Sequence, residues 1–390
     1  MIPRHFYHRF NELLSSFPIV TILGPRQCGK TNFIKKALPS WHYLDLEKPS
    51  DWNYITQDPE QAFKDLKSGF ILDEAQSAPK IFSVLRSHVD ENRKARGQVV
   101  LLGSASPQLI RHASETLAGR TGFLDMTPFQ WQEISKIKKT SLDSLWLRGG
   151  FPDAYLAVSD RRRLDWFEAY TRTFIERDLF SLGMKLSPPM MRKLMHMLAN
   201  YNGGIWNASQ IASSLGTSYH TINNYTDILE QTYLIRKLQP YYSNIGKRLI
   251  KSPKLYFRDT GLLHFFLGVN SSLSLMRSPV RGSSWESFII EQLLSLLAVR
   301  YPGTQSYYWR TSSGEETDLL IDFKGKLIPF EVKLHTAPQR SDLHGLYSCM
   351  HDLKLPNGYV IYPGEKDCPI GEGVKALSAA RLLNSDFKLN

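Results

Sequence analysis

The most informative stretch of this 390-residue sequence is Gly24-Pro25-Arg26-Gln27-Cys28-Gly29-Lys30-Thr31, which fits the pattern G-x-x-x-x-G-K-[ST]. The apolar run FPIVTILG (17–24) leads into it and the amphipathic run TNFIKKAL follows it, so it connects a predicted strand to a predicted helix. In such a loop the backbone N–H groups and the helix N-terminus point at a bound phosphate. We therefore expect all eight residues to bind the phosphates of a nucleotide, with ATP as the cofactor.

Two side chains of this loop and two acids further along have predicted roles in nucleotide chemistry. Lys30 is expected to reach the β- and γ-phosphates, and the Thr31 hydroxyl is expected to bind Mg²⁺. A second apolar run, Phe70-Ile71-Leu72, ends in Asp73-Glu74, which is typical of a Walker B element. We expect Asp73 to hold the metal and Glu74 to polarise the attacking water.

Two further candidates lie downstream of the Walker B element. Ser104, followed closely by Ser106, ends the apolar run QVVLLGS, where a hydroxyl can reach the γ-phosphate or the attacking water. A helix N-cap is the alternative role for these serines. Arg120 is the candidate for an arginine supplied to the nucleotide of a neighbouring subunit, and an ordinary surface arginine is the alternative.

The wider pattern predicts an α/β chain. Apolar runs at 17–24, 41–46, 69–75 and 98–104 alternate with amphipathic runs, which indicates a parallel sheet covered on both faces. Residues 160–232 have helical periodicity, and the C-terminal part has the order α-β-β-β-α-β. The segments LRGGFP and GVNSSLSLMRSP have the composition of linkers. We expect three domains, which are a P-loop domain at 1–150, a mostly helical region at 151–270 and a mixed α/β domain at 281–390.

Several segments together carry a resemblance to a known family. GPRQCGKT, ILDEAQ, LLGSAS, ETLAGR, the following TPF and LRGGFP resemble those of bacterial and archaeal AAA+-type ATPases that end in a domain of unknown function. The resemblance implies an AAA+-like ATPase core, self-association into a homo-oligomer, and a winged-helix region before the C-terminal domain. Lys30, Thr31, Asp73 and Glu74 match the nucleotide motifs of that family, and Arg120 matches a recurrent position.

The middle of the chain has the order of a winged helix-turn-helix. Three helical runs within 190–232, with a turn at Gly216, precede the strand-like runs LIRKLQPYY and PKLYFRD. Polar residues at the start of the third helical run are placed for contacts to a base or a phosphate: Ser218, Tyr219, His220, Asn223 and Asn224. The tip between the two strands forms a basic wing that can track a DNA backbone, with Lys247, Arg248, Lys251 and Lys254. Residues 151–280 carry a net charge of +7, against +5 before them and −1 after them, which favours a polyanion partner. A protein-contact module is the alternative.

The C-terminal part combines three acids and a lysine. Glu286 lies in a long helical run, Asp318 in the alternating strand ETDLLIDF, and Glu331 and Lys333 in GKLIPFEVKLH. Asp318 and Glu331 are expected on adjacent antiparallel strands, with Lys333 on the same face as Glu331. Two such carboxylates can hold Mg²⁺ while a lysine orients or activates a water for phosphodiester attack. An acidic strand edge stabilised by an ion pair is the alternative.

This arrangement resembles the PD-(D/E)XK nuclease fold of restriction enzymes and junction resolvases. The resemblance implies Glu286 as the helical acid, Asp318 and Glu331 as metal ligands, and Lys333 as the catalytic lysine. Such domains also bind without cleaving. The net charge of −1 for residues 281–390 argues against a grip on DNA by this domain alone.

Composition excludes several classes of protein. Hydrophobic residues at 42% and charged residues at 22% exclude wholesale disorder, and no apolar run approaches the ~18 residues of a bilayer span. Three cysteines without metal-site spacing and the lack of a visible secretory signal favour the cytoplasm. We expect an ATP-hydrolysing protein that acts on or near DNA. The alternatives are a Mg²⁺-dependent nuclease regulated by ATP, and a nucleotide switch that binds a protein partner without DNA.

Overall fold

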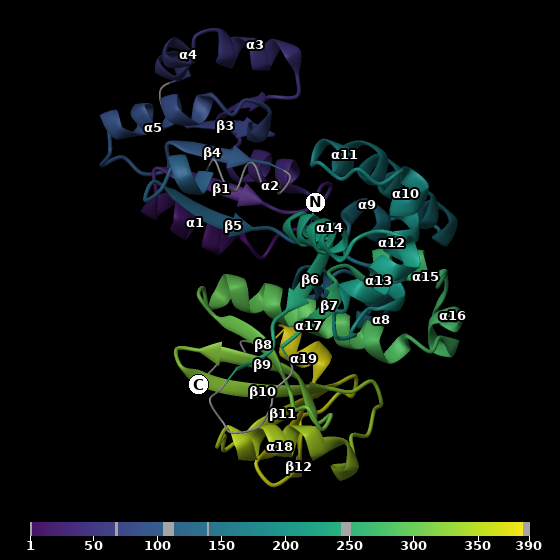
Figure 1. Ribbon diagram of the computed structural model, residues 1–390. Coiled ribbons are helices and arrows are strands. Elements are labelled where there is room, and N and C mark those ends of the chain that lie inside the picture. The colour runs from purple at the N-terminus through teal and green to yellow at the C-terminus, as the bar shows by residue number, and fades with distance from the viewer. Residues whose placement is uncertain (1, 67–68, 104–112, 139, 243–250, 385–390) are drawn as a thin grey trace. The chain divides into compact units, whose positions relative to one another are not determined.

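The computed structural model describes residues 2–66, 69–103, 113–138, 140–242 and 251–384. The chain divides into two compact units, Met1–Pro128 with Gln231–Tyr233, and Phe129–Glu230 with Leu234–Asn390. Within the described residues there are a five-stranded sheet, a helical middle and a mixed six-stranded sheet (Figure 1). The predicted α/β fold class is therefore confirmed. In the same residues no helix has the length and apolar character needed to cross a membrane.

The first unit is built on a parallel sheet with the strand order β2-β3-β4-β1-β5. β1, β3 and β4 are buried along their whole length, because helices cover both faces of the sheet. The strands are β1 (Ile19–Leu23), β2 (His42–Asp45), β3 (Phe70–Asp73), β4 (Val99–Leu102) and β5 (Thr121–Asp125). The helices are α1 (Tyr7–Ser16), α2 (Lys30–Ala37), α3 (Pro49–Gln57), α4 (Pro59–Leu66) and α5 (Ile81–Glu91).

The sequence predicted four of these strands and missed β5. This strand is short and carries Gly122 at its second position, which weakens the strand pattern. Gly122 is there for a packing reason, since a Cβ atom at this position would lie 2.6 Å from the ring of Phe17 and 2.9 Å from the side chain of Leu13. The close approach lets α1 pack against β5 and β1.

Helices dominate the first half of the second unit. One hydrophobic core joins helices that lie far apart in sequence, with Phe167, Leu194, Ile222 and Leu263 among its buried residues. The helices are α7 (Trp131–Ile134), α8 (Leu142–Arg148), α9 (Pro152–Tyr155), α10 (Asp160–Thr173), α11 (Leu179–Ser181), α12 (Pro188–Asn200), α13 (Ala208–Leu215), α14 (Tyr219–Gln231), α15 (Thr260–Leu267) and α16 (Ser272–Arg277). Between α14 and α15 lies an antiparallel hairpin of β6 (Ile235–Leu238) and β7 (Lys254–Phe257), so the predicted order of helices and strands is present.

The mixed sheet of the second unit has the order β12-β13-β11-β10-β9-β8. Its strands are β8 (Gln305–Arg310), β9 (Glu316–Phe323), β10 (Lys326–Val332), β11 (Gly358–Tyr362), β12 (Cys368–Gly371) and β13 (Val374–Ser378), and its helices are α17 (Arg281–Arg300), α18 (His344–Asp352) and α19 (Ala379–Asn384). β9 and β10 form the predicted antiparallel pair. The sequence missed β12 and β13, because β12 is a short edge strand that contains Pro369 and an irregular register.

The hairpin is joined to this sheet by backbone and side chains. The Tyr308 N–H of β8 donates to the Gln239 carbonyl (3.0 Å), and the Tyr241 N–H donates to the Tyr308 carbonyl (2.8 Å). Glu291 of α17 accepts from Arg236 of β6 and from Arg258, the residue after β7. Burial alone would raise the pKa of Glu291, but the two guanidinium groups outweigh it and hold the pKa below its usual range.

The first predicted linker is buried, and the second is largely exposed but contains a helix. Gly149, Gly150 and Phe151 are buried, and the Gly150 N–H donates to the buried carboxylate of Asp259 (2.7 Å). The second segment contains α16, whose start is capped by Ser271. The two compact units divide earlier, between Pro128 and Phe129. The boundaries of three domains stay a prediction.

Candidate functional site

The loop Gly24–Thr31 runs from the end of β1 to the start of α2, as predicted. Gly24 has a positive φ of 155°, and a Cβ atom there would lie 2.1 Å from the Met126 carbonyl oxygen. Only glycine therefore allows the chain to leave β1 in this direction. Arg4, which the sequence did not single out, fixes the loop from outside by donating to the carbonyl of Cys28 (2.8 Å) and to that of Thr127 (2.5 Å).

Lys30 turns back into the loop that precedes it. Its ammonium group donates to the carbonyls of Gly24 and Pro25, both at 2.9 Å, and its side chain is buried. Both partners are neutral carbonyls of the loop itself. Among the residues that the structure describes, no carboxylate pairs with the Lys30 ammonium, and a phosphate oxygen is a stronger partner than either carbonyl.

The Walker B acid lies beside the loop. Asp73 ends β3, and only β4 separates β3 from β1 in the sheet. Because parallel strands end at the same edge, Asp73 meets the start of α2, where the Thr31 hydroxyl donates to Asp73 Oδ2 (2.8 Å). A hydroxyl and a carboxylate side by side are oxygen donors of the kind that Mg²⁺ prefers. The donor set therefore fits a Mg²⁺–nucleotide complex.

Tyr43 is a member of this site that the sequence did not reveal. It lies on β2, next to β3, and its hydroxyl donates to the same Asp73 Oδ2 at 2.6 Å. Burial raises the pKa of Tyr43 well above its ordinary value, and the bond to Asp73 adds to the effect. The tyrosine therefore stays protonated and holds the carboxylate in one orientation.

Glu74 has an unusual backbone. Its φ is 51°, in the left-handed region, and its side chain accepts a hydrogen bond from the amide of Gln76. A non-glycine residue in this region is uncommon and is found most often where function requires a fixed side-chain direction. Ser104 and Ser106, the other candidates near the γ-phosphate, lie outside the described residues.

Arg120 is held on the opposite edge of the sheet from the loop. It directly precedes β5, and its carbonyl accepts from the Ile19 N–H at the start of β1, whereas the loop follows the end of β1. Its guanidinium forms a two-pronged pair with Asp90, at 2.9 and 2.7 Å. Within its own chain Arg120 therefore does not belong to the nucleotide site.

The residues predicted for DNA contact are only partly exposed. Asn223 is half-buried and accepts from the Trp206 indole (3.1 Å), and Ser218 accepts from the Thr221 N–H at the start of α14 (3.0 Å). Ser218, Tyr219, His220 and Asn224 are exposed. Lys251 is exposed, and Lys247 and Arg248 lie outside the described residues. The prediction for Lys254 was wrong, because this side chain is only 3% exposed and pairs with Glu286.

Lys254 lies among the acids of the nuclease-like set. Its ammonium is 3.0 Å from Glu286 Oε1 and 3.7 Å from Asp318 Oδ1, and it also pairs with Glu316. We call Glu286, Glu316, Asp318 and Glu331 together with Lys254 the acid cluster. The structure thus brings the three predicted acids together, and adds a fourth acid and a lysine that the sequence did not place there.

Other contacts of the acid cluster are made within the C-terminal sheet. Asp318 Oδ2 accepts from the Val332 N–H (2.8 Å), and Lys333 pairs with Glu331 Oε1 (2.7 Å). Burial, then the charges of Glu286 and Glu331, raise the pKa of Asp318 well above its usual value. Burial raises the pKa of Glu331 to about 6, against the opposing effect of Lys333. Burial alone would lower the pKa of Lys254, but its acidic neighbours, Glu286 first, raise it.

The acid cluster does not fit a metal ion. In the described residues no group of three or more His, Cys, Asp or Glu side chains is arranged to hold one. The position between Glu286 and Asp318 is taken by the Lys254 ammonium, which supplies the positive charge that the resemblance to nucleases assigns to Mg²⁺.

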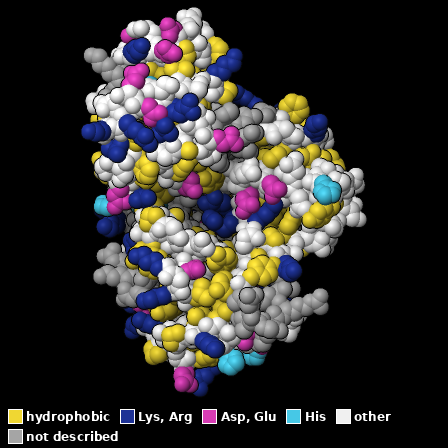
Figure 2. Space-filling model, turned by 60° about the vertical axis from the view of Figure 1, so that its left-hand side comes forward, with side chains coloured by type: hydrophobic (Ala, Val, Ile, Leu, Met, Phe, Trp, Pro, Cys, Tyr) yellow, Lys and Arg dark blue, Asp and Glu magenta, His cyan; other side chains and the backbone are white. Residues whose placement is uncertain are grey.

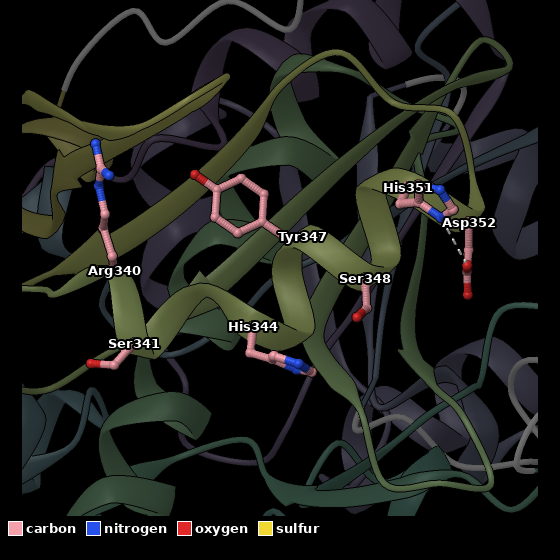
Figure 3. Close-up of a pocket in the computed structure, with 7 residues that line it drawn as sticks. All are labelled: Arg340, Ser341, His344, Tyr347, Ser348, His351 and Asp352. Carbon is pink, nitrogen blue, oxygen red and sulfur yellow. Dashed lines mark hydrogen bonds and ion pairs between the residues drawn. The ribbon is translucent and has the colours of Figure 1, made fainter.

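A separate hollow of about 440 Å³ lies on the outer side of the C-terminal domain. Figure 3 shows Arg340, His344 and Tyr347 along it, with His351 close to Asp352 (3.5 Å). His344 and Ser348 also approach Glu315, at 3.8 and 2.9 Å. None of the residues predicted for catalysis lines this hollow.

The strand, loop and helix that carry Lys30 and Thr31 beside Asp73 define a P-loop domain of the AAA type. The family model of the AAA domain matches residues 16–135. Residues 139–273 match the domain of unknown function DUF8612, and residues 281–382 match the domain of unknown function DUF4143. The prediction of an AAA+-type P-loop domain is therefore confirmed.

Whole-chain comparisons extend this result. The chain is 38% identical over 380 residues to an uncharacterized protein of Mycobacterium tuberculosis, covering 97% of this chain and 83% of that protein. An uncharacterized protein of Mycobacterium bovis matches with the same identity and coverage. The chain belongs to the family of these mycobacterial proteins. Among solved structures, a Walker-type ATPase of Pyrococcus abyssi is 14% identical, with a TM-score of 0.46 over 68% of this chain and 96% of that one.

Proposed function

We propose that this protein is a Mg²⁺-dependent ATPase. The observation that carries the proposal is the contact between Thr31 and Asp73 (2.8 Å), beside a loop whose lysine donates to two neutral carbonyls. Lys30 would exchange its two carbonyl partners for phosphate oxygens, and the loop N–H groups would hold the same phosphates. Glu74 would orient the attacking water.

Thr31 and Asp73 would hold Mg²⁺ bound to the nucleotide. The ion would neutralise charge on the phosphates during hydrolysis. Tyr43 would position Asp73 for this role, because a ligand carboxylate with a fixed hydrogen-bond partner keeps its orientation.

Substitution of Lys30 tests the proposal directly. Lys30→Ala is expected to lower the rate of phosphate release from ATP by at least about 100-fold, because a positive charge aimed at the transferred phosphate is lost. Lys36→Ala is the matched control, since Lys36 is an exposed residue of the same helix and should leave the rate unchanged. Unchanged phosphate release in Lys30→Ala would refute the assignment.

We also propose that the chain works as a homo-oligomer, with three domains at 1–150, 151–270 and 281–390. Arg120 is the candidate for an arginine that reaches a neighbour's nucleotide, and to do so it would have to leave Asp90. Arg120→Ala should then lower hydrolysis by about 1,000-fold while ATP binding persists. Asp90→Ala is the control for a merely structural ion pair. An equal loss of activity in both variants would argue against a role at a neighbour's nucleotide.

DNA is the proposed partner of the middle region, read as a winged helix-turn-helix. The support is the exposure of Tyr219, His220 and Asn224 at the start of α14. On the face in Figure 2, described Lys and Arg side chains are dispersed among acidic and apolar ones. The proposed contact is therefore limited to the start of α14, and most of the predicted basic wing lies outside the described residues. A salt titration of DNA binding, with His220→Ala/Asn224→Ala as the variant, tests it. Binding that does not weaken with salt, or is unchanged in the variant, would favour the protein-partner alternative.

A further inference from the structure

Lys254 lies where a nuclease of the PD-(D/E)XK type would need a metal ion. Its ammonium contacts Glu286 at 3.0 Å and Asp318 at 3.7 Å, and pairs with Glu316. The residue is 3% exposed, so water does not screen these contacts. The Tyr256 hydroxyl donates to the same oxygen atom of Glu286 that Lys254 contacts.

Side-chain cations offset most of the negative charge of the cluster without a metal. Four carboxylates, Glu286, Glu316, Asp318 and Glu331, face three cations, since Arg310 pairs with Glu316 and Lys333 with Glu331. A divalent ion added to this set would meet the Lys254 charge a few ångströms away, in a buried place where repulsion is strong. Removal of Lys254 would leave four carboxylates facing two cations, so the excess of negative charge would grow.

We propose that Lys254 is a built-in cation that replaces a divalent metal in the acid cluster, so that Asp318 and Glu331 do not bind Mg²⁺ while β7 is in place. The C-terminal domain then does not cleave nucleic acid through these residues. Its acids instead fasten the β6–β7 hairpin to the C-terminal sheet.

The backbone fixes Lys254 in this position. As the first residue of β7 it pairs with Leu238 of β6, and it also forms a bridge with Ile205. The Trp206 N–H donates to the Pro253 carbonyl (2.7 Å), immediately before it. A change of side-chain rotamer alone therefore does not free the cluster.

Glu331 supplies an independent sign that the cluster would accept a divalent cation once Lys254 is removed. Its Oε2 atom is buried and, among the described residues, has no hydrogen-bond partner, whereas its Oε1 atom pairs with Lys333. A buried carboxylate oxygen without a partner is an available ligand. Removal of Lys254 should therefore open a divalent-cation site that includes Glu331.

A titration of the full-length, nucleotide-free protein with MnCl₂ tests the proposal, with free Mn²⁺ measured by electron paramagnetic resonance. Lys254→Met should bind Mn²⁺ at least about tenfold more tightly than the wild type, because the repelling charge is gone. Adding Glu331→Gln should abolish the gain. Lys251→Met, an exposed lysine on the same connection, should behave like the wild type.

A milder variant covers the case in which Lys254→Met does not fold. Lys254→Met/Glu316→Gln also removes one of the acids that would be left unbalanced, and it should gain Mn²⁺ binding in the same way. Mn²⁺ binding and DNA nicking by the wild type also test the proposal. Three outcomes would overturn the proposal. The first is equal Mn²⁺ affinity in the wild type and either folded variant, and the second is wild-type Mn²⁺ binding that Glu331→Gln abolishes. The third is Mg²⁺-dependent DNA nicking by the wild type that Glu331→Ala abolishes.

Discussion

The nucleotide loop and the acid cluster each hold one buried lysine among oxygen atoms, but the charges of those oxygens differ. Lys30 donates to two neutral carbonyls of its own loop, whereas Lys254 pairs with carboxylates from α17 and β9. A phosphate can replace a carbonyl with a gain in charge interaction, but Lys254 gains little by exchanging its carboxylates for another anion. A sequence motif therefore identifies which residue types form a site. Whether a ligand can bind there depends on the charge of the groups that those residues already contact.

The largest effect is expected from removing the charge of Lys254. Lys254→Met should lower the free energy of unfolding by about 3–5 kcal/mol, because it leaves buried carboxylates without their cation. Urea unfolding followed by tryptophan fluorescence measures it, with Lys251→Met expected within about 0.5 kcal/mol of the wild type. A loss as small as that of the control would mean that the cluster does not fasten the hairpin.

The pH dependence of stability gives a smaller effect from the same cluster. The folded state raises the pKa of Glu331 from 4.5 to about 6, so between these values the folded protein binds more protons than the unfolded chain. Stability from this group is therefore present below pH 4.5 and is lost as pH rises through about 6. As pH rises from 4.5 to about 6, the free energy of unfolding of the wild type should fall by about 2 kcal/mol more than that of Glu331→Gln.

Urea unfolding of the wild type and Glu331→Gln at a series of pH values measures the difference. Glu372→Gln, an exposed acid of the same sheet region, is the control and should follow the wild type. Parallel pH profiles for the wild type and Glu331→Gln would contradict the raised pKa.

The smallest effect concerns the nucleotide loop. Tyr43→Phe removes one hydrogen bond to Asp73, so the Mg²⁺ concentration for half-maximal ATP hydrolysis should rise about tenfold, with a smaller change in the maximal rate. A Mg²⁺ titration of the hydrolysis rate measures it. Tyr54→Phe, on the exposed side of α3, should not change the Mg²⁺ requirement. A drop in maximal rate at an unchanged requirement would mean that Tyr43 does not act through the metal.

Residues whose role is set by local sequence could be predicted. The loop Gly24–Thr31 and the strand that ends in Asp73 need only a strand, a turn and a helix in sequence order. Tyr43 and Arg4 could not, because their contacts to Asp73 and Cys28 join positions 30 and 24 residues apart and leave no local pattern. β5 was missed for a related reason, because Gly122 is required by the close packing of Leu13 and Phe17 and not by the local strand pattern.

Lys254 shows how a reasonable rule can mislead. Lysines are rarely buried, so a lysine beside the basic tip was predicted to be exposed. A signal was nevertheless present, because Lys254 and Tyr256 alternate on one face of β7 and both contact Glu286 of α17. An alternating strand with polar residues on one face needs a polar surface opposite it, and the acids of α17 and β9 supply that surface.

The link between Glu291 and the two arginines beside the hairpin has a practical consequence for dissecting this protein. A shortened chain that stops before α17 would leave Arg236 and Arg258 without the Glu291 carboxylate. It would also remove Tyr308, which bonds the backbone of the segment directly after β6. Such a fragment should aggregate when it is expressed. A fragment of residues 129–390 should instead unfold in a single cooperative thermal transition.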